Sequence, residues 1–197
     1  MPKVFTTLKN GGVKTIFIYN NNEFALISSS KEGCFYASIV SLNNGKELFK
    51  TKCLPKKYID YNGLGSSSIH HGNKIFLSIG APEQRSSKIR ALAQDNNSMF
   101  GKIISVDLKT KDFEIVAMGS RNAQGLYYDK NKNIIVHTEH GPKGGDEINI
   151  NLNPDNKTIE NYGWPISSYG VKYGDKINEP YYKITHNNEG FKEPIYV

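Results

Sequence analysis

The sequence predicts an all-β protein, and two observations support this. Short runs of β-branched and aromatic residues recur along the chain, separated by turn-forming segments such as NNN, NNG, LKTKD and DKNKN. The 3.6-residue periodicity of amphipathic helices is nearly absent from the same stretches. We therefore expect short strands joined by tight turns over most of the chain.

Each expected strand is an apolar run bounded by turn residues. These strands cover residues 14–19, 23–29, 35–42, 47–53, 74–80, 102–107, 113–117, 125–128, 134–138 and 147–151. The segment HHGN, with His70 and His71, is expected to be a tight turn before the strand at 74–80. Four-stranded antiparallel units repeated side by side would produce this rhythm. The pattern therefore indicates a β-propeller, with a β-sandwich as the alternative.

Charge and hydropathy argue against two kinds of partner. The chain carries 25 Lys and Arg against 19 Asp and Glu, a formal net charge of +6. Its arginines are Arg85, Arg90 and Arg121, and its lysines are scattered without the interleaved aromatic residues of a nucleic-acid groove. No apolar run approaches the roughly 20 residues that span a bilayer. We expect neither nucleic-acid binding nor a membrane span.

Cys34 and Cys53 flank an expected hairpin with its turn at Asn43-Asn44-Gly45. If Leu42 pairs with Gly45, the register places the two cysteines directly opposite each other, where a cross-strand disulfide is sterically possible. Two buried free thiols are the alternative. The disulfide is favoured, and it would indicate an oxidising compartment.

Residues able to do chemistry concentrate between Gly119 and Gly170. The sequence there reads GSRNAQGLYYDKNKNIIVHTEHGPKGGDEINI and then NYGWPISSYG. Glycines beside charged residues let backbone carbonyls approach a ligand closely, and Ca²⁺ binds several oxygens at once. Composition alone is compatible with a cation site and also with plain turns. The polar stretch 82–99 is too long for an ordinary hairpin loop and is a second candidate for function.

Three separated motifs in this region resemble the soluble PQQ-dependent aldose sugar dehydrogenases of the glucose/sorbosone dehydrogenase family. The first covers residues 119–125. The second combines TEHGP (138–142) with GGDEIN (144–149), and the third is NYGWP (161–165). The resemblance extends over about residues 63–194. It implies a six-bladed β-propeller, usually exported to the periplasm. Residues 1–197 would form one partial propeller of about four blades, truncated at both ends.

The resemblance also implies roles at the cofactor. Arg121 and Asn122 would contact the carboxylates and carbonyls of the quinone, and a guanidinium can also stabilise a reducing quinone oxygen. The backbone carbonyls of Gly141 and Pro142 would hold the Ca²⁺ ion, and His140 would line the site.

Asp146 and Glu147 match the family's acidic pair, which contacts the cofactor or orients the glycine-rich loop. Trp164 is expected to be a buried aromatic residue that closes a blade. His137 is expected to be a packed or surface residue of a strand.

The pattern departs from the family at the catalytic base. Asn62 stands where the family has its base histidine, and Ala81 stands where it has the partner aspartate. An amide cannot take a proton near neutral pH, and loss of a general base typically costs roughly 10² to 10⁴ in rate. Another base, such as Glu83 or Asp95, would then be needed.

The function implied is oxidation of the C1 hydroxyl of an aldose sugar by hydride transfer to a Ca²⁺-bound quinone, with electrons passed to a periplasmic acceptor. The alternative is a non-catalytic propeller that binds a sugar, a glycan or a protein. A hydrolase using Glu139 and Glu147 as a carboxylate pair is a third possibility, which requires a fixed separation of the two carboxyl groups.

Overall fold

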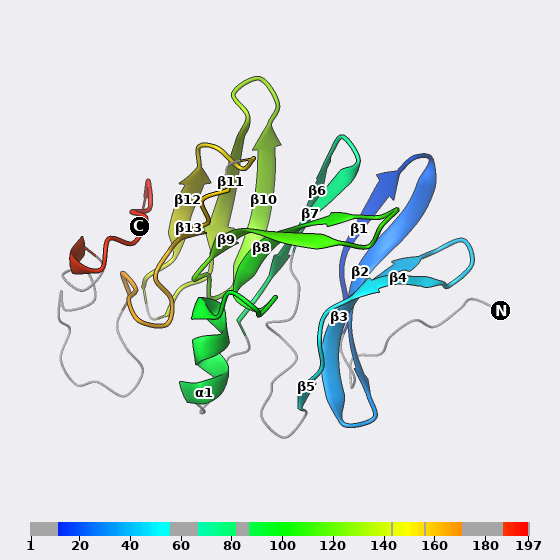
Figure 1. Ribbon diagram of the computed structural model, residues 1–197, viewed down its shortest axis with the longest axis horizontal. Coiled ribbons are helices and arrows are strands. Elements are labelled where there is room, and N and C mark those ends of the chain that lie inside the picture. Colours follow the sequence, from blue (N-terminus) through cyan, green and yellow to red (C-terminus); the bar gives the residue numbers. More distant parts are fainter. Residues whose placement is uncertain are drawn as a thin grey trace.

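Strands arranged in three sheets dominate the computed structural model, which describes residues 12–55, 67–81, 87–142, 144–155, 157–170 and 187–196. The prediction of an all-β protein is therefore confirmed. The helical elements α1 (Ser87–Arg90) and η3 (Ala91–Gln94) are single short turns. In the described part of the chain, neither is long and apolar enough to cross a membrane. Figure 1 shows the three sheets side by side across the molecule, in chain order.

The first two sheets are built mainly from antiparallel neighbours in sequence order. The first has the order β1 (Gly12–Tyr19), β2 (Asn22–Lys31), β3 (Cys34–Ser41) and β4 (Glu47–Lys50), and β5 (Leu54–Pro55) also pairs with β3. The second has the order β6 (Ser68–His71), β7 (Lys74–Ile79), β8 (Lys102–Asp107) and β9 (Phe113–Met118), with β13 (Glu160–Asn161) parallel to β9.

The third sheet has the order β10 (Ala123–Asp129), β11 (Ile134–Glu139) and β12 (Glu147–Asn151). An isolated bridge joins Ile148 of β12 to Tyr196 near the end of the chain. About four blades were expected from the sequence, and three sheets of blade size are formed by the residues described.

The middle sheet is apolar on both faces because it packs between the other two. Side chains alternate across a strand, so Ile75 and Leu77 of β7 join one buried cluster with the first sheet, whereas Phe76 joins another with the third sheet. In β8, Ile104 and Ile103 divide in the same way. Nearly continuous apolar runs in β7 and β8 therefore reflect face-to-face packing of neighbouring sheets.

Cys34 and Cys53 form a disulfide with a Cα–Cα distance of 5.2 Å, as favoured from the sequence. The register on which that prediction rested holds at Val40 and Glu47, next to the turn, but is wrong at the cysteines. A bulge between Ile39 and Val40 shifts the pairing of β3 with β4 by one residue, and a further shift beyond β4 brings Cys34 opposite Pro55. A bulge adds a residue to one strand, so symmetric counting from the turn fails beyond it.

The expected turn at His70 and His71 is also wrong. Both residues belong to β6, where they pair with Ile75 and Lys74. The turn needs only the two residues that follow them, and its glycine, Gly72, adopts a φ of 56° that favours glycine.

Candidate functional site

Arg121 lies at the centre of the candidate site, in the connection between β9 and β10. Its side chain is 5% exposed, and its Nη1 donates to the carbonyl oxygens of His140 at 2.7 Å and Gly141 at 3.3 Å. The guanidinium carbon lies 5.7 Å from the ring centroid of Trp164. The fold thus brings together residues from all three sequence motifs.

The backbone of Arg121 is held as firmly as its side chain. Its N–H donates to Oε1 of Glu139 at 2.5 Å, and its carbonyl accepts the N–H of Ala81 at 2.7 Å. Ala81, which stands at the expected aspartate position, is therefore in direct contact with the candidate site, and it is 2% exposed.

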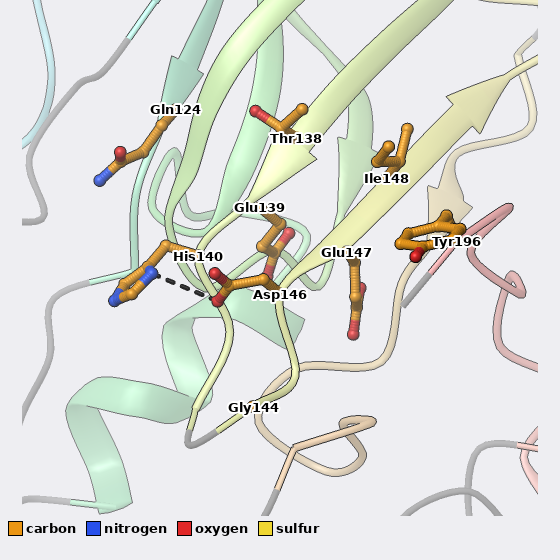
Figure 2. Close-up of a pocket in the computed structure, with 9 residues that line it drawn as sticks. All are labelled: Gln124, Thr138, Glu139, His140, Gly144, Asp146, Glu147, Ile148 and Tyr196. Atoms are coloured by element: carbon orange, nitrogen blue, oxygen red, sulfur yellow. Dashed lines mark ion pairs between the residues drawn. The ribbon is translucent and has the colours of Figure 1, made fainter.

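The loop after β11 is folded around the carboxylate of Asp146. Oδ1 of Asp146 accepts the N–H of Gly141 at 3.0 Å and lies 3.2 Å from Nδ1 of His140. Figure 2 shows the His140 ring pointing toward this carboxylate. The N–H of His140 donates to the carbonyl of Asn122 at 3.0 Å, which ties the loop to the segment that carries Arg121. Asp146 thus orients the loop in this structure.

Backbone packing leaves no room for a side chain at three glycines of this site. A Cβ at Gly141 would fall 1.7 Å from the carbonyl oxygen of Gly145, and a Cβ at Gly145 would fall 2.2 Å from the nitrogen of Gly170. A Cβ at Gly170 would fall 1.8 Å from the carbonyl oxygen of Pro142. Glycine is therefore required here by close approach of the backbones.

The carbonyl oxygens of Gly141 and Pro142, which the family resemblance implies as cation ligands, each accept one hydrogen bond from the protein. Gly141 accepts from Arg121, and Pro142 accepts the N–H of Gly145 at 2.8 Å. Each carbonyl oxygen has two lone pairs, so one remains for an ion such as Ca²⁺. Among the described residues, no group of three or more His, Cys, Asp or Glu side chains could hold a metal. A cation at this site would thus depend on backbone oxygens.

Glu139 and Glu147 are opposed on β11 and β12, and both are buried. Burial, followed by the charge of Glu147, raises the pKa of Glu139 to about 8. Burial also raises the pKa of Glu147 to about 7, with a further contribution from Asp146, whereas a hydrogen bond from Nδ2 of Asn149 at 3.1 Å opposes that shift. The pair therefore retains protons near neutral pH.

His137 belongs to the same buried face, as expected for a packed strand residue. It is 1% exposed, and burial lowers its pKa to about 3, so the ring is neutral at physiological pH. Its Nε2 lies 3.9 Å from Oε2 of Glu139, and its ring meets the ring of Tyr162 edge-on.

A pocket of about 470 Å³ opens beside this acidic pair. Glu139, His140, Asp146 and Glu147 line it together with residues of β10, β11, the loop after β11, β12 and the last described segment, namely Gln124, Thr138, Gly144, Ile148 and Tyr196 (Figure 2). Its wall is thus acidic and adjoins the loop of Gly141.

Trp164 is half-buried, whereas the sequence predicted a buried aromatic residue. Its carbonyl accepts Nε2 of Gln94 at 2.7 Å, and its N–H donates to the carbonyl of Gly119 at 2.9 Å. Gln94 in turn forms a reciprocal amide pair with Asn161. In the sequence, Gln94 belonged to the polar stretch 82–99 and Asn161 to the motif NYGWP, and neither of them was assigned a role.

Lys102 is a second feature that the sequence did not reveal. This lysine is 0% exposed, and its Nζ donates to the carbonyls of Leu92, Ala93 and Phe100 at 2.9, 2.7 and 3.0 Å. Burial lowers the pKa of Lys102 to about 8. Its side chain holds η3, and with it Gln94, against β8.

The predicted base position lies outside the site as described. Asn62 and Glu83 are not among the described residues. Asp95 is exposed, and its Oδ1 accepts the N–H of Asn97 at 2.8 Å. No base has thus been located in the described part of the site.

Comparison with known proteins gives a consistent picture. The family model "Glucose / Sorbosone dehydrogenase" matches residues 36–197. The chain is 32% identical over 136 residues to aldose sugar dehydrogenase YliI of Escherichia coli K12, a region covering 62% of this chain and 33% of that protein.

Solved structures share the fold. The soluble aldose sugar dehydrogenase of E. coli, in its apo-form, superposes with a TM-score of 0.68 at 24% identity, covering 85% of this chain and 53% of that one. A glucose dehydrogenase superposes with a TM-score of 0.66 at 23% identity, covering 82% and 52%. The chain spans about half the length of these structures. Because its three sheets superpose on them, they belong to a β-propeller.

Proposed function

Because the chain belongs to the glucose/sorbosone dehydrogenase family, we propose that it forms part of a PQQ-dependent aldose sugar dehydrogenase. The proposed reaction oxidises the C1 hydroxyl of a sugar to a lactone, with hydride transfer to the quinone and electrons passed on to a periplasmic acceptor. One observation supports this most strongly. The Arg121 guanidinium donates to the carbonyl of Gly141, 20 residues away, and so joins the proposed quinone and Ca²⁺ contacts in one place.

The residues of the site suit an anionic, planar cofactor. The planar guanidinium of an arginine such as Arg121 can form two parallel hydrogen bonds to a carboxylate. The Trp164 ring beside it offers an aromatic face. Asn122, His140 and Asp146 are proposed to line the cofactor, in agreement with the hydrogen bonds that tie them to the same loop.

The carbonyls of Gly141 and Pro142 are proposed to hold the Ca²⁺ ion. When bound, Ca²⁺ and quinone supply a polarised carbonyl that accepts hydride. The protein's part is to fix the two carbonyls, and the close contacts of Gly141 and Gly145 support this because they leave the loop one backbone path.

Export to the periplasm is proposed with this function. The disulfide between Cys34 and Cys53 supports it, since such bonds persist mainly in oxidising compartments.

A non-catalytic propeller that binds a sugar, a glycan or a protein is the second candidate. The observation that favours it is Ala81, which is buried against the Arg121 backbone and offers a methyl group where the family resemblance implies an aspartate. A methyl group can neither orient nor charge a neighbouring base.

Reconstitution with PQQ and Ca²⁺ separates the two candidates. The protein is supplied with several aldoses and a dye acceptor, and turnover is compared among the wild type, Arg121→Ala and the double variant Asn62→His with Ala81→Asp. Wild-type turnover that Arg121→Ala abolishes supports the dehydrogenase. Turnover in the double variant alone supports the binding protein.

A further inference from the structure

We propose that Gln94 and Asn161 are positioning residues that fix the indole of Trp164 against the guanidinium of Arg121, a proposal that rests on the proposed function. Gln94 ends η3, and Asn161 ends β13, so two segments distant in sequence meet here. Nε2 of Gln94 donates to Oδ1 of Asn161 at 3.1 Å, and Nδ2 of Asn161 donates to Oε1 of Gln94 at 2.8 Å.

This amide pair is tied directly to the backbone of Trp164. Nε2 of Gln94 also donates to the carbonyl of Trp164 at 2.7 Å, and Oδ1 of Asn161 accepts the N–H of Gly163 at 3.0 Å. Exchange of the oxygen and nitrogen in Gln94 would set its oxygen against the carbonyl oxygen of Trp164, and the same exchange in Asn161 would set its nitrogen against the N–H of Gly163. Each amide therefore has one orientation, and the turn that leads to Trp164 has one geometry.

The same amide pair also lies close to the backbone of Gly119, in the segment that carries Arg121. Gly119 has a φ of 73°, and a Cβ there would fall 2.2 Å from Oδ1 of Asn161 and 2.9 Å from Nε2 of Gln94. The carbonyl of Gly119 accepts the N–H of Trp164 at 2.9 Å. Only Ser120 separates Gly119 from Arg121, so the amide pair fastens Trp164 and Arg121 to each other through a few bonds.

A preset arrangement lowers the cost of binding a planar anion. If the Trp164 ring were loose, binding would have to order it, and the loss of side-chain freedom on binding weakens affinity. Neither Gln94 nor Asn161 needs to touch the quinone to have this effect. Their loss should weaken quinone binding indirectly, through the position of Trp164 relative to Arg121.

Trp164 is the only tryptophan of the chain, so its fluorescence reports its own position. Gln94→Glu replaces the donating nitrogen by an oxygen at nearly constant size. We expect red-shifted emission, stronger quenching by acrylamide, and about a tenfold rise in the Kd of PQQ measured calorimetrically with Ca²⁺ present. Asn161→Asp, which removes the reciprocal donor, should act in the same direction and serves if Gln94→Glu fails to fold.

Asn97→Asp is the matched control, because Asn97 is an exposed amide shortly after Gln94 and its change adds the same charge. It should leave emission and affinity unchanged. Wild-type emission and quenching in Gln94→Glu and Asn161→Asp would overturn the proposal. A mobile Trp164 with unchanged PQQ affinity would overturn the positioning role. If wild-type protein binds no PQQ, the proposed function fails, and the fluorescence of the apoprotein still decides whether the pair fixes Trp164.

Discussion

Glu139 and Glu147 hold protons in the folded protein that the unfolded chain releases. Their ordinary pKa is 4.5, and burial raises it to about 8 and about 7. Between pH 4.5 and these raised pKa values, the folded state therefore binds more protons than the unfolded chain. The contribution of the two carboxyls to the free energy of unfolding should fall as pH rises from about 4.5 to about 8. The expected loss is at least about 1 kcal/mol per carboxyl. Urea denaturation across this pH range measures it.

The double variant Glu139→Gln with Glu147→Gln tests the assignment. Glutamine keeps an acceptor for the Arg121 N–H and cannot ionise, so the slope with pH should flatten. His137, with its pKa lowered from 6.5 to about 3, stays neutral in the folded protein but is protonated in the unfolded chain below about pH 6.5. Its contribution therefore makes the free energy of unfolding rise with pH up to about 6.5, opposite to the contribution of the two carboxyls, and it remains in the double variant. An unchanged slope in the double variant would show that other groups cause it.

Lys102 should stabilise the fold through its three carbonyl partners rather than through its charge. Lys102→Met keeps the length of the side chain and leaves the carbonyls of Leu92, Ala93 and Phe100 without this donor. We expect the free energy of unfolding to fall by about 1 to 3 kcal/mol in urea denaturation. Lys109→Met, at an exposed position, is the control. Equal stability of the two variants would contradict the role of Lys102.

Residues of this kind show where the sequence was insufficient. Lys102 is the first residue of a predicted strand, and the side chain of a lysine at the start of a strand is ordinarily exposed to solvent. Its burial depends on η3 folding back over β8, which no local pattern records. Glu139 and Glu147 were noted as a pair, but their burial depends on how neighbouring sheets pack. Arg121 and Gly141 were predictable as neighbours only because a family resemblance linked their motifs.

Among the elements, the loop between β11 and β12 should be the most sensitive to added volume. Gly141→Ala places a methyl group against the carbonyl oxygen of Gly145 and must displace the loop. We expect at least a tenfold loss of Ca²⁺-dependent PQQ affinity in calorimetry, with the thermal unfolding of the sheets largely retained. Gly144→Ala is the control, since its Cβ meets no atom within 4 Å and the variant carries only the backbone strain of a φ of 78°, about 1 to 2 kcal/mol. A greater loss of affinity in Gly144→Ala than in Gly141→Ala would contradict this account of the loop.

The disulfide should stabilise the first sheet by limiting the unfolded chain. It closes a loop with a sequence separation of 19, for which about 3 kcal/mol is typical. Cys34→Ser with Cys53→Ser should therefore lower the free energy of unfolding in urea by roughly that amount. Reduction of the wild type should reproduce the loss and leave the double variant unaffected. A wild type insensitive to reductant would contradict this contribution.

The strands themselves were largely predictable. The runs at 102–107 and 147–151 match β8 and β12 residue for residue, because clear turn residues bound each of them. The register of β3 on β4 was not predictable, since a bulge leaves no mark in the sequence. β6 was missed because its last residues, His70 and His71, resemble a turn, and β13 because two residues carry no periodicity.

At the scale of the whole molecule, both faces of the middle sheet are covered, as the face-to-face packing of propeller blades requires. The apolar runs of β7 and β8 pointed to strands, but their assignment to two separate interfaces required the structure. The same packing brings η3, β13 and the loop after β11 to Arg121. The candidate site is thus a product of contacts between sheets.

Equilibrium binding of PQQ with and without Ca²⁺ tests the central claim most directly. The account predicts that the wild type binds the quinone, that chelation of Ca²⁺ weakens binding, and that Arg121→Ala lowers the affinity at least about tenfold, as expected for loss of a charged hydrogen bond. Arg90→Ala, a second arginine in the helix before η3, should bind as the wild type does. Calcium-independent binding of equal strength in wild type, Arg121→Ala and Arg90→Ala, or no binding at all, would contradict it.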